Sequence, residues 1–468
     1  MRYIRIIALI LVLIMCFHIY ALAAEDESDT AITNGCHSLD ASMTYLGAKS
    51  ITENVCSAIV YETNSGTLMY SLNADDKVYP SSLTKILTAL IAVEKGDLQD
   101  VITVTQDVLD TVPYYAASAE LVADEKITLS DLLYCMMVGS ANDAAAVIAN
   151  HISGSQNAFV KDMNAYANAV GCTGTQFVNV HGLHDEEQFT TTRDMARILE
   201  KAVENDDFLT YFSAVHYNVP ATNKSEMREL SSGNFLMNID NLQIYQDTRV
   251  TGGRTGTTED GARCLASLAE QDSMRLICVV MGSESTFADN GSTLTYGSFK
   301  ETSALLDAAF DGYMVAQILF ENQVLQQCQV SNGKNDVVLG ALASVYSVLP
   351  TDTSISDLSY RLKDDTSLLA APISSGQIIS TVEVWYGNLC VGQSELVAMN
   401  AVDAASTQQS TGNNITDNTH SDVTAIIIVS IVVGAVLLLV LLRFFGKIRA
   451  CFTTKHNKAY RRNRRRSR

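Results

Sequence analysis

The sequence has few prolines, glycines and cysteines, and each shortage excludes a class of protein. Five prolines and 26 glycines among 468 residues are too few for a collagenous chain or a Pro/Gly-rich disordered one. Ten cysteines are too sparse for a small disulfide scaffold, and no Cys-x-x-Cys pair indicates a metal site. With 47% hydrophobic residues, the chain has enough apolar side chains for a large packed core.

Basic residues are also fewer than acidic ones over most of the chain. The whole sequence has 32 Lys and Arg against 52 Asp and Glu, a net charge of -20. Because a protein that holds nucleic acid through its phosphates needs a basic surface, no nucleic-acid partner is expected. The charges are distributed unevenly along the chain, because residues 443–468 carry eleven cations and no acid.

Two apolar runs predict that the chain is exported and anchored in a membrane. Arg2 and Arg5 precede an apolar stretch that ends in small residues near Ala24, the pattern of a secretory signal peptide over residues 1–24. An uncleaved signal anchor is the alternative. Residues 423–442 contain no charged side chain, and a helix of this length spans about 30 Å, the hydrocarbon thickness of a bilayer.

The charges that follow residues 423–442 predict the orientation of the chain. Cations gather on the cytoplasmic side of a spanning helix, so residues 443–468 are expected in the cytoplasm, where they can contact anionic lipid. Residues 25–422 then face outward from the cell membrane. Residues 401–422 are mostly small and polar without a periodic pattern, which predicts a flexible linker.

Eight of the ten cysteines fall in the outward-facing part of the chain. An even number permits disulfides, but the sequence does not give their pairing. Several, such as Cys278 within Leu276–Val280, lie in apolar strand or helix patterns. Small buried hydrophobic residues are therefore a better interpretation of these cysteines than disulfide bridges.

A serine and a lysine lie at the start of a strongly apolar helix pattern. Val55–Tyr61 and Thr67–Tyr70 flank an Asn-Ser-Gly turn, which predicts a β-hairpin, and residues 80–96 then predict a mostly buried helix. Ser82 and Lys85 are three positions apart and share one face of that helix. Burial lowers the pKa of a lysine, and a neutral amine beside a hydroxyl is a general base for a serine nucleophile.

Ser-x-x-Lys alone is a weak signal, because the same spacing recurs at Ser331–Lys334 in a polar turn. A helix cap and a surface lysine are the alternative interpretation of the first copy. Further evidence comes from a second predicted helix, Leu132–Ala149, in which Ser140 and Asn142 interrupt an apolar pattern. Polar side chains in a buried helix need hydrogen-bond partners, which points to a shared site.

The third segment with chemical character is Val250–Thr258, which is rich in glycine and threonine around Arg254. It precedes two predicted strands, Arg263–Ala269 and Arg275–Gly282, whose four-residue connection suits a hairpin. A cation, a hydroxyl and open backbone N–H groups on one strand can bind an anion. An ordinary strand with a tight glycine turn is the alternative.

Taken in order, Ser-x-x-Lys, Ser-x-Asn and a basic residue before Thr-Gly form the motif set of serine β-lactamases and penicillin-binding proteins. The chain resembles the low-molecular-mass penicillin-binding proteins that act as serine-type D-alanyl-D-alanine carboxypeptidases. Segments at Phe177–Leu183, Thr190–Ala196 and Ala371–Gln377 are also similar to that family. The resemblance covers roughly residues 50–400, most of the outward-facing chain.

The resemblance implies an α/β (α+β) fold. A domain like β-lactamases and transpeptidases, with an antiparallel sheet flanked by helices, is expected over residues 50–312. A small all-β domain is expected over residues 313–400, where Thr381–Tyr386 and Leu389–Met399 flank a two-residue turn and independently predict a hairpin. The C-terminal transmembrane helix over residues 423–442 completes the expected architecture.

The family's residue roles carry over to the matching positions of this sequence. Ser82 is expected to be the acylated nucleophile, Lys85 its general base, and Ser140 the residue that passes a proton to the leaving group. An oxyanion-hole donor typically contributes about 3 kcal/mol to lowering the barrier. Asn142 is expected to bind the substrate's amide and to orient Lys85. Arg254 and Thr255 are expected to bind the terminal carboxylate, with Gly256 on the same strand as a further binding residue. The N–H groups of Ser82 and Thr257 are expected to form the oxyanion hole.

One residue departs from the family pattern, because the third motif usually begins with lysine and Arg254 takes that place. Arginine keeps the charge and binds carboxylates with two hydrogen bonds, but it is larger than lysine. Carboxylate binding is therefore expected to survive. The reaction rate and the affinity for antibiotics are the properties that this substitution is expected to affect.

The expected reaction removes the terminal D-alanine from peptidoglycan pentapeptides, with β-lactam antibiotics as acylating inhibitors. A non-catalytic penicillin-binding or wall-binding protein is the alternative, and a β-lactamase is a further one that lacks an evident second carboxylate motif. The chain has no Gly-x-Ser-x-Gly elbow, which disfavours a histidine-based serine hydrolase. No cofactor or metal is expected, because His181 and His184 lack a third ligand.

Overall fold

The computed structural model describes residues 39, 46, 55–238, 240, 243–287 and 294–405. The predicted signal peptide, the linker beyond residue 405, the predicted span over residues 423–442 and the basic tail lie outside the described residues. No helix of the described part combines the length and the apolar composition that crossing a membrane requires.

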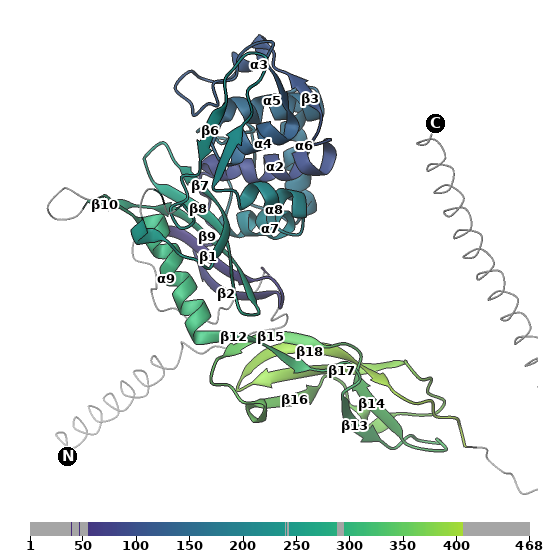
Figure 1. Ribbon diagram of the computed structural model, residues 1–468. Helices are drawn as coiled ribbons and strands as arrows, with labels where there is room; N and C mark the ends of the chain where they lie inside the picture. Colours follow the sequence, from purple (N-terminus) through teal and green to yellow (C-terminus); the bar gives the residue numbers. More distant parts are fainter. Residues whose placement is uncertain are drawn as a thin grey trace, which may run out of the picture. The chain divides into compact units, whose positions relative to one another are not determined.

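A five-stranded antiparallel sheet lies at the centre of the N-terminal lobe (Figure 1). Its strands are β1 (Val55–Glu62), β2 (Thr67–Leu72), β7 (Val250–Thr257), β8 (Arg263–Gln271) and β9 (Met274–Ser283). The order is β2-β1-β9-β8-β7. The predicted early hairpin is confirmed, and its strand β1 also pairs with β9, the first of three strands from much later in the chain. β7 is therefore an edge strand of this sheet.

Helices cover both faces of this sheet, which explains why its strands are apolar on both sides (Figure 1). The main helices of the lobe are α2 (Thr84–Lys95), α4 (Leu129–Met137), α5 (Asn142–Ser153), α6 (Gln156–Ala169), α7 (Thr192–Ala202), α8 (Asp206–Phe212) and α9 (Gly297–Gly312). Ile277 and Val279 of β9 belong to the core shared with α2 and α7, whereas Cys278 and Val280 belong to the core shared with α9. The predicted antiparallel sheet flanked by helices is confirmed.

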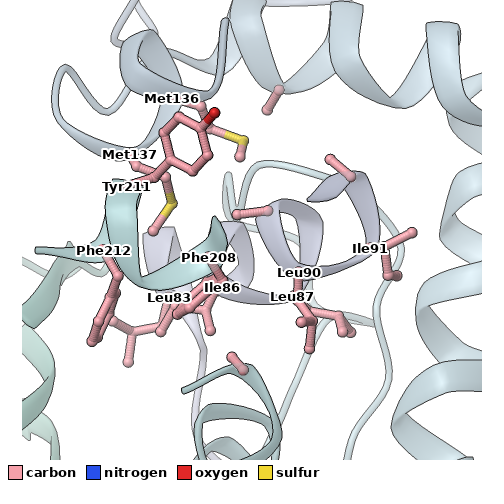
Figure 2. Packing of buried hydrophobic residues seen from close by; sticks show 14 of the residues in the cluster. Leu83, Ile86, Leu87, Leu90, Ile91, Met136, Met137, Phe208, Tyr211 and Phe212 are labelled. Atoms are coloured by element: carbon pink, nitrogen blue, oxygen red, sulfur yellow. The ribbon is translucent and has the colours of Figure 1, made fainter. Parts of the chain in front are cut away.

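Helix α2 runs through the helical core, and ten of its twelve residues are buried. Full burial of one leucine or isoleucine side chain contributes roughly 1.5–3 kcal/mol, so the start of this helix is firmly held. Among the side chains drawn in Figure 2 are four of its own, Ile86, Leu87, Leu90 and Ile91, and Leu83 of the turn before it. They belong to one apolar core with Met136 and Met137 of α4 and Phe208, Tyr211 and Phe212 of α8.

The prediction of one continuous helix over Leu132–Ala149 is wrong, because the structure divides this segment into α4 and α5. Helix α4 ends at Met137, and α5 begins at Asn142. Ser140 between them has a φ of 62°, a left-handed conformation that an L-residue does not adopt within a right-handed helix. The break places Ser140 between the helices and Asn142 in the first turn of α5, where both side chains can meet other segments.

The C-terminal lobe is built of strands, as predicted. Its elements are β12 (Tyr313–Leu319), β13 (Val324–Cys328), β14 (Val337–Ala341), β15 (Val345–Pro350), β16 (Leu358–Leu362), β17 (Ile378–Tyr386) and β18 (Leu389–Ala398). One sheet has the order β13-β14-β18-β17-β16, and β12 pairs with β15 in another. Val382, Val384 and Leu396 belong to its apolar core, and the predicted hairpin is confirmed by β17 and β18.

Three cysteines illustrate the expected use of this residue as a small buried hydrophobic side chain. Cys135, Cys172 and Cys278 are buried thiols outside any disulfide. Burial raises the pKa of each thiol to about 12, so each stays protonated at neutral pH. All three pack within the apolar cores of the N-terminal lobe.

Candidate active site

The nucleophile turn, defined as Ser81–Leu83, is a single 3-10 turn that leads directly into α2. Ser82 and Lys85 lie on the same face, as their spacing predicts. Lys85 Nζ is 3.1 Å from Ser82 Oγ. Ser81 has a φ of 50°, so the chain bends sharply immediately before Ser82.

Lys85 is held by two further oxygen atoms from distant parts of the chain. Its Nζ lies 2.7 Å from Asn142 Oδ1 and 2.7 Å from the carbonyl oxygen of His181. These two oxygens only accept hydrogen bonds, whereas the Ser82 hydroxyl can donate one. A neutral amine has two N–H donors and one lone pair, and this set of three partners matches it.

The surroundings of Lys85 favour that neutral form. Its side chain is completely buried, and burial lowers its pKa well below the ordinary value for lysine. The Arg254 cation lowers this pKa further, and the Asp143 carboxylate opposes both effects. Burial also lowers the pKa of the nearby His181 imidazole to about 3, so His181 adds no charge. Lys85 is therefore suited to accept a proton from Ser82.

Asp143 organises one side of the site, and sequence reasoning missed it. Its buried carboxylate accepts hydrogen bonds from Ser118 Oγ at 2.6 Å and from the N–H of Ala119 at 2.9 Å. The N–H of Asn142 donates to the carbonyl of Ala117 at 2.7 Å, so the same loop is fixed at two points. The only signal in the sequence was an acid next to Asn142 at the start of an apolar helix segment.

Arg254 lies next to Ser140, a contact that sequence reasoning did not predict. Its Nη2 donates to Ser140 Oγ at 2.6 Å, and its Nη1 donates to the carbonyl oxygen of Met137 at 3.3 Å. Only 4% of Arg254 is exposed, and no ion pair joins it to a carboxylate among the described residues. Burial lowers its pKa to about 10, so it remains a buried cation that an incoming anion can stabilise.

The edge strand β7 brings Thr255, Gly256 and Thr257 beside the nucleophile turn. A Cβ atom on Gly256 would lie 3.2 Å from Ser81 Cβ and 3.3 Å from Ser82 N, so a glycine permits this close approach. The N–H of Thr257, the expected oxyanion-hole donor, donates to Ser81 Oγ at 2.9 Å. Sequence reasoning did not foresee that this donor has a partner within the protein.

Gly182 is a second glycine that the site requires. It follows His181, whose carbonyl holds Lys85, and it has a φ of 86°. A Cβ atom on Gly182 would lie 1.8 Å from the carbonyl oxygen of Ser81. The segment that positions Lys85 can therefore pass against the nucleophile turn only where a side chain is absent.

A small open pocket adjoins the nucleophile turn. Ser81, Gly182 and Thr257 form one part of its wall, and Tyr79, His184 and Glu259 another. His184 Nε2 lies 3.3 Å from Glu259 Oε2, and the rings of His184 and Tyr79 meet edge to face at 4.6 Å. The pocket therefore opens beside Ser81, the residue that precedes Ser82.

Comparison with protein families agrees with this geometry. Residues 47–285 match the family described as D-alanyl-D-alanine carboxypeptidase, and residues 313–404 match the C-terminal domain of penicillin-binding protein 5. The chain belongs to the D-alanyl-D-alanine carboxypeptidase family. The family assignment made from the three sequence motifs is thereby confirmed, together with its serine-type carboxypeptidase activity.

Individual relatives extend the similarity over both lobes. The D-alanyl-D-alanine carboxypeptidase DacC of Escherichia coli K12 is 30% identical over 358 residues, which span 74% of this chain and 83% of the relative. DacF of Bacillus subtilis is 28% identical over 336 residues, spanning 70% and 80%. The crystal structure of penicillin-binding protein 5 from Haemophilus influenzae is similar at a TM-score of 0.62 and 28% identity, covering 75% of this chain and 98% of that one.

Proposed function

We propose that this carboxypeptidase removes the terminal D-alanine of peptidoglycan stem peptides through an acyl-enzyme on Ser82. The observation that carries the proposal is the contact of 3.1 Å between Ser82 Oγ and Lys85 Nζ, with Lys85 buried and held by two acceptors. Ser82 Oγ attacks the carbonyl carbon of the penultimate D-alanine while Lys85 accepts its proton. The peptide C–N bond then breaks, and water later hydrolyses the Ser82 ester.

Ser140 and Arg254 suit the leaving-group side of this reaction. The Ser140 hydroxyl passes the proton to the leaving nitrogen, so that D-alanine departs as a neutral amine. Arg254 is a buried cation beside Ser140, and with the Thr255 hydroxyl it binds the terminal carboxylate of the substrate. Asn142 keeps Lys85 oriented through its Oδ1, and its amide nitrogen donates to the substrate's amide.

Penicillin titration tests this function. One equivalent of labelled penicillin is expected to attach to the peptide that contains Ser82, and D-alanine release from a pentapeptide mimic should fall in proportion to labelling. The peptide that contains Ser331 serves as the control for the second Ser-x-x-Lys spacing. Labelling without any D-alanine release by the unlabelled protein would favour a binding protein, and rapid nitrocefin turnover would favour a β-lactamase.

Replacing Arg254 with methionine is expected to lower kcat/KM about 30-fold for peptides that end in a free carboxylate, since a charged hydrogen bond contributes about 2 kcal/mol. At a pH where Lys85 is unprotonated in both proteins, a C-terminally amidated peptide, which lacks that charge, should lose little. The Arg254→Lys variant keeps the positive charge but changes the shape of the side chain, so it distinguishes the effect of the charge from that of the guanidinium geometry. If kcat/KM fell equally for both peptides, Arg254 would not bind the substrate's carboxylate. Its role would then be limited to its hydrogen bond with Ser140.

We also propose that the chain works at the outer face of the cell membrane. Residues 1–24 as a signal peptide, residues 423–442 as a spanning helix and residues 443–468 as a cytoplasmic tail support this placement by sequence alone. The catalytic domain over residues 50–312 and the β-domain over residues 313–400 then face the wall precursor. Recovery of the full chain in the soluble rather than the membrane fraction would contradict the placement.

A further inference from the structure

We infer that, in the empty enzyme, the Ser81 hydroxyl is hydrogen-bonded to the main-chain N–H and C=O of Thr257. We infer further that substrate or β-lactam displaces this hydroxyl when it binds. Ser81 is thereby a positioning residue that sets the affinity of the site for its ligands. The inference rests on the proposed function, with the N–H of Thr257 as one of the two oxyanion-hole donors that the family resemblance implies.

The Ser81 hydroxyl makes two hydrogen bonds to one residue of the edge strand. Its Oγ accepts from the N–H of Thr257 at 2.9 Å and donates to the carbonyl oxygen of Thr257 at 2.5 Å. In an antiparallel strand the N–H and C=O of one residue point to the same side, and a paired chain would bond to both. The hydroxyl therefore satisfies both groups that an extended peptide beside β7 would use.

Ser81 is built into this position. Its left-handed φ of 50° and the absence of a side chain at Gly256 bring its Cβ against the strand, and only 7% of the residue is exposed. Ser82 follows immediately, so the bond that Thr257 makes to Ser81 lies next to the reacting hydroxyl. One N–H cannot give a full hydrogen bond to Ser81 Oγ and to the oxyanion at the same time.

The ligand must replace both hydrogen bonds when it binds. A carbonyl oxygen takes over the N–H of Thr257, and an amide N–H takes over its carbonyl; acyl-D-alanyl-D-alanine and the acylamino β-lactams carry both groups. With alanine at position 81, water covers the two groups instead. A loosely held water is displaced more readily than a hydroxyl fixed on the same chain.

Ser81→Ala tests this inference in the full chain with a fluorescent penicillin. Acylation rates over a concentration series give the dissociation constant of the non-covalent complex and the rate constant of acylation separately. The dissociation constant is expected to fall about tenfold, from the loss of two competing hydrogen bonds, while the rate constant stays within about twofold. Ser81→Gly suits the left-handed φ and should give the same fall, which provides a second variant should Ser81→Ala fold poorly.

Ser57→Ala is the matched control, because Ser57 is a buried serine of β1 whose hydroxyl donates to the carbonyl of Asn73 at 3.0 Å. It is expected to lower the unfolding temperature without changing the dissociation constant. A dissociation constant that stays the same or rises in both Ser81 variants, while wild type is labelled at Ser82, overturns the inference alone. Absence of labelling in wild type overturns the proposed function instead.

Discussion

Replacing Lys85 with methionine is expected to slow acylation of Ser82 by penicillin about 1,000-fold, within the range of general-base catalysis. Lys85 Nζ lies 3.1 Å from Ser82 Oγ, and its surroundings favour the neutral amine. Methionine fills the buried space with a side chain of similar length and removes the lone pair that accepts the proton. Labelling rates measured against Ser82→Ala, as the reference without a nucleophile, give the size of the loss.

Lys95→Met is the matched control for this prediction. Lys95 ends the same helix, but it is exposed and pairs with Asp162 at 2.8 Å. An exposed ion pair contributes little, so acylation by this variant should stay within about twofold of wild type. A Lys85→Met protein that reacts as fast as Lys95→Met would show that Lys85 is not the base.

The pH dependence of acylation follows from the same contact. Burial and the Arg254 cation lower the pKa of Lys85 well below its ordinary value, and only the unprotonated amine accepts the Ser82 proton. The acylation rate of wild type therefore rises with pH through this lowered pKa and levels off above it. Removing the Arg254 charge raises the pKa of Lys85, so the rise should move to higher pH in Arg254→Met.

The parts of the site that follow from local patterns were predictable. The apolar spacing along residues 83–93 identified a buried helix, and helical geometry then placed Ser82 and Lys85 on one face. The two hairpins β1–β2 and β17–β18 followed from short turns between apolar runs. In each case the contact joins residues close in sequence, so periodicity alone carries the information.

The remaining features depend on backbone conformation or on contacts between distant residues. A left-handed φ at Ser140 separates α4 from α5, although the apolar pattern runs through both. The bond between Ser81 and Thr257 joins residues 176 positions apart, and the bond from Lys85 to the His181 carbonyl joins residues 96 apart. A main-chain oxygen has no sequence signature, so only the folded structure reveals these partners.

Gly182→Ala is expected to lower the free energy of unfolding by about 4 kcal/mol and to abolish penicillin labelling. The added Cβ would lie 1.8 Å from the Ser81 carbonyl oxygen, and the residue would also have to keep a φ of 86°. The main chain must therefore move at the nucleophile turn or at His181. Either movement separates Ser82 from Lys85, so stability and acylation are lost together. Urea unfolding and labelling rates measure the two effects.

Gly154→Ala is the control that distinguishes the two costs expected for Gly182→Ala, the steric clash of the added Cβ atom and the strain of a left-handed alanine. Gly154 caps the C-terminus of α5 with a φ of 76°, but a Cβ atom there would meet no atom within 4 Å. This variant should lose only the cost of a left-handed alanine, about 1 kcal/mol, and should be labelled at the wild-type rate. If Gly182→Ala were no less stable than Gly154→Ala, the close packing of residues 181–182 against Ser81 would not be what holds Lys85 beside Ser82.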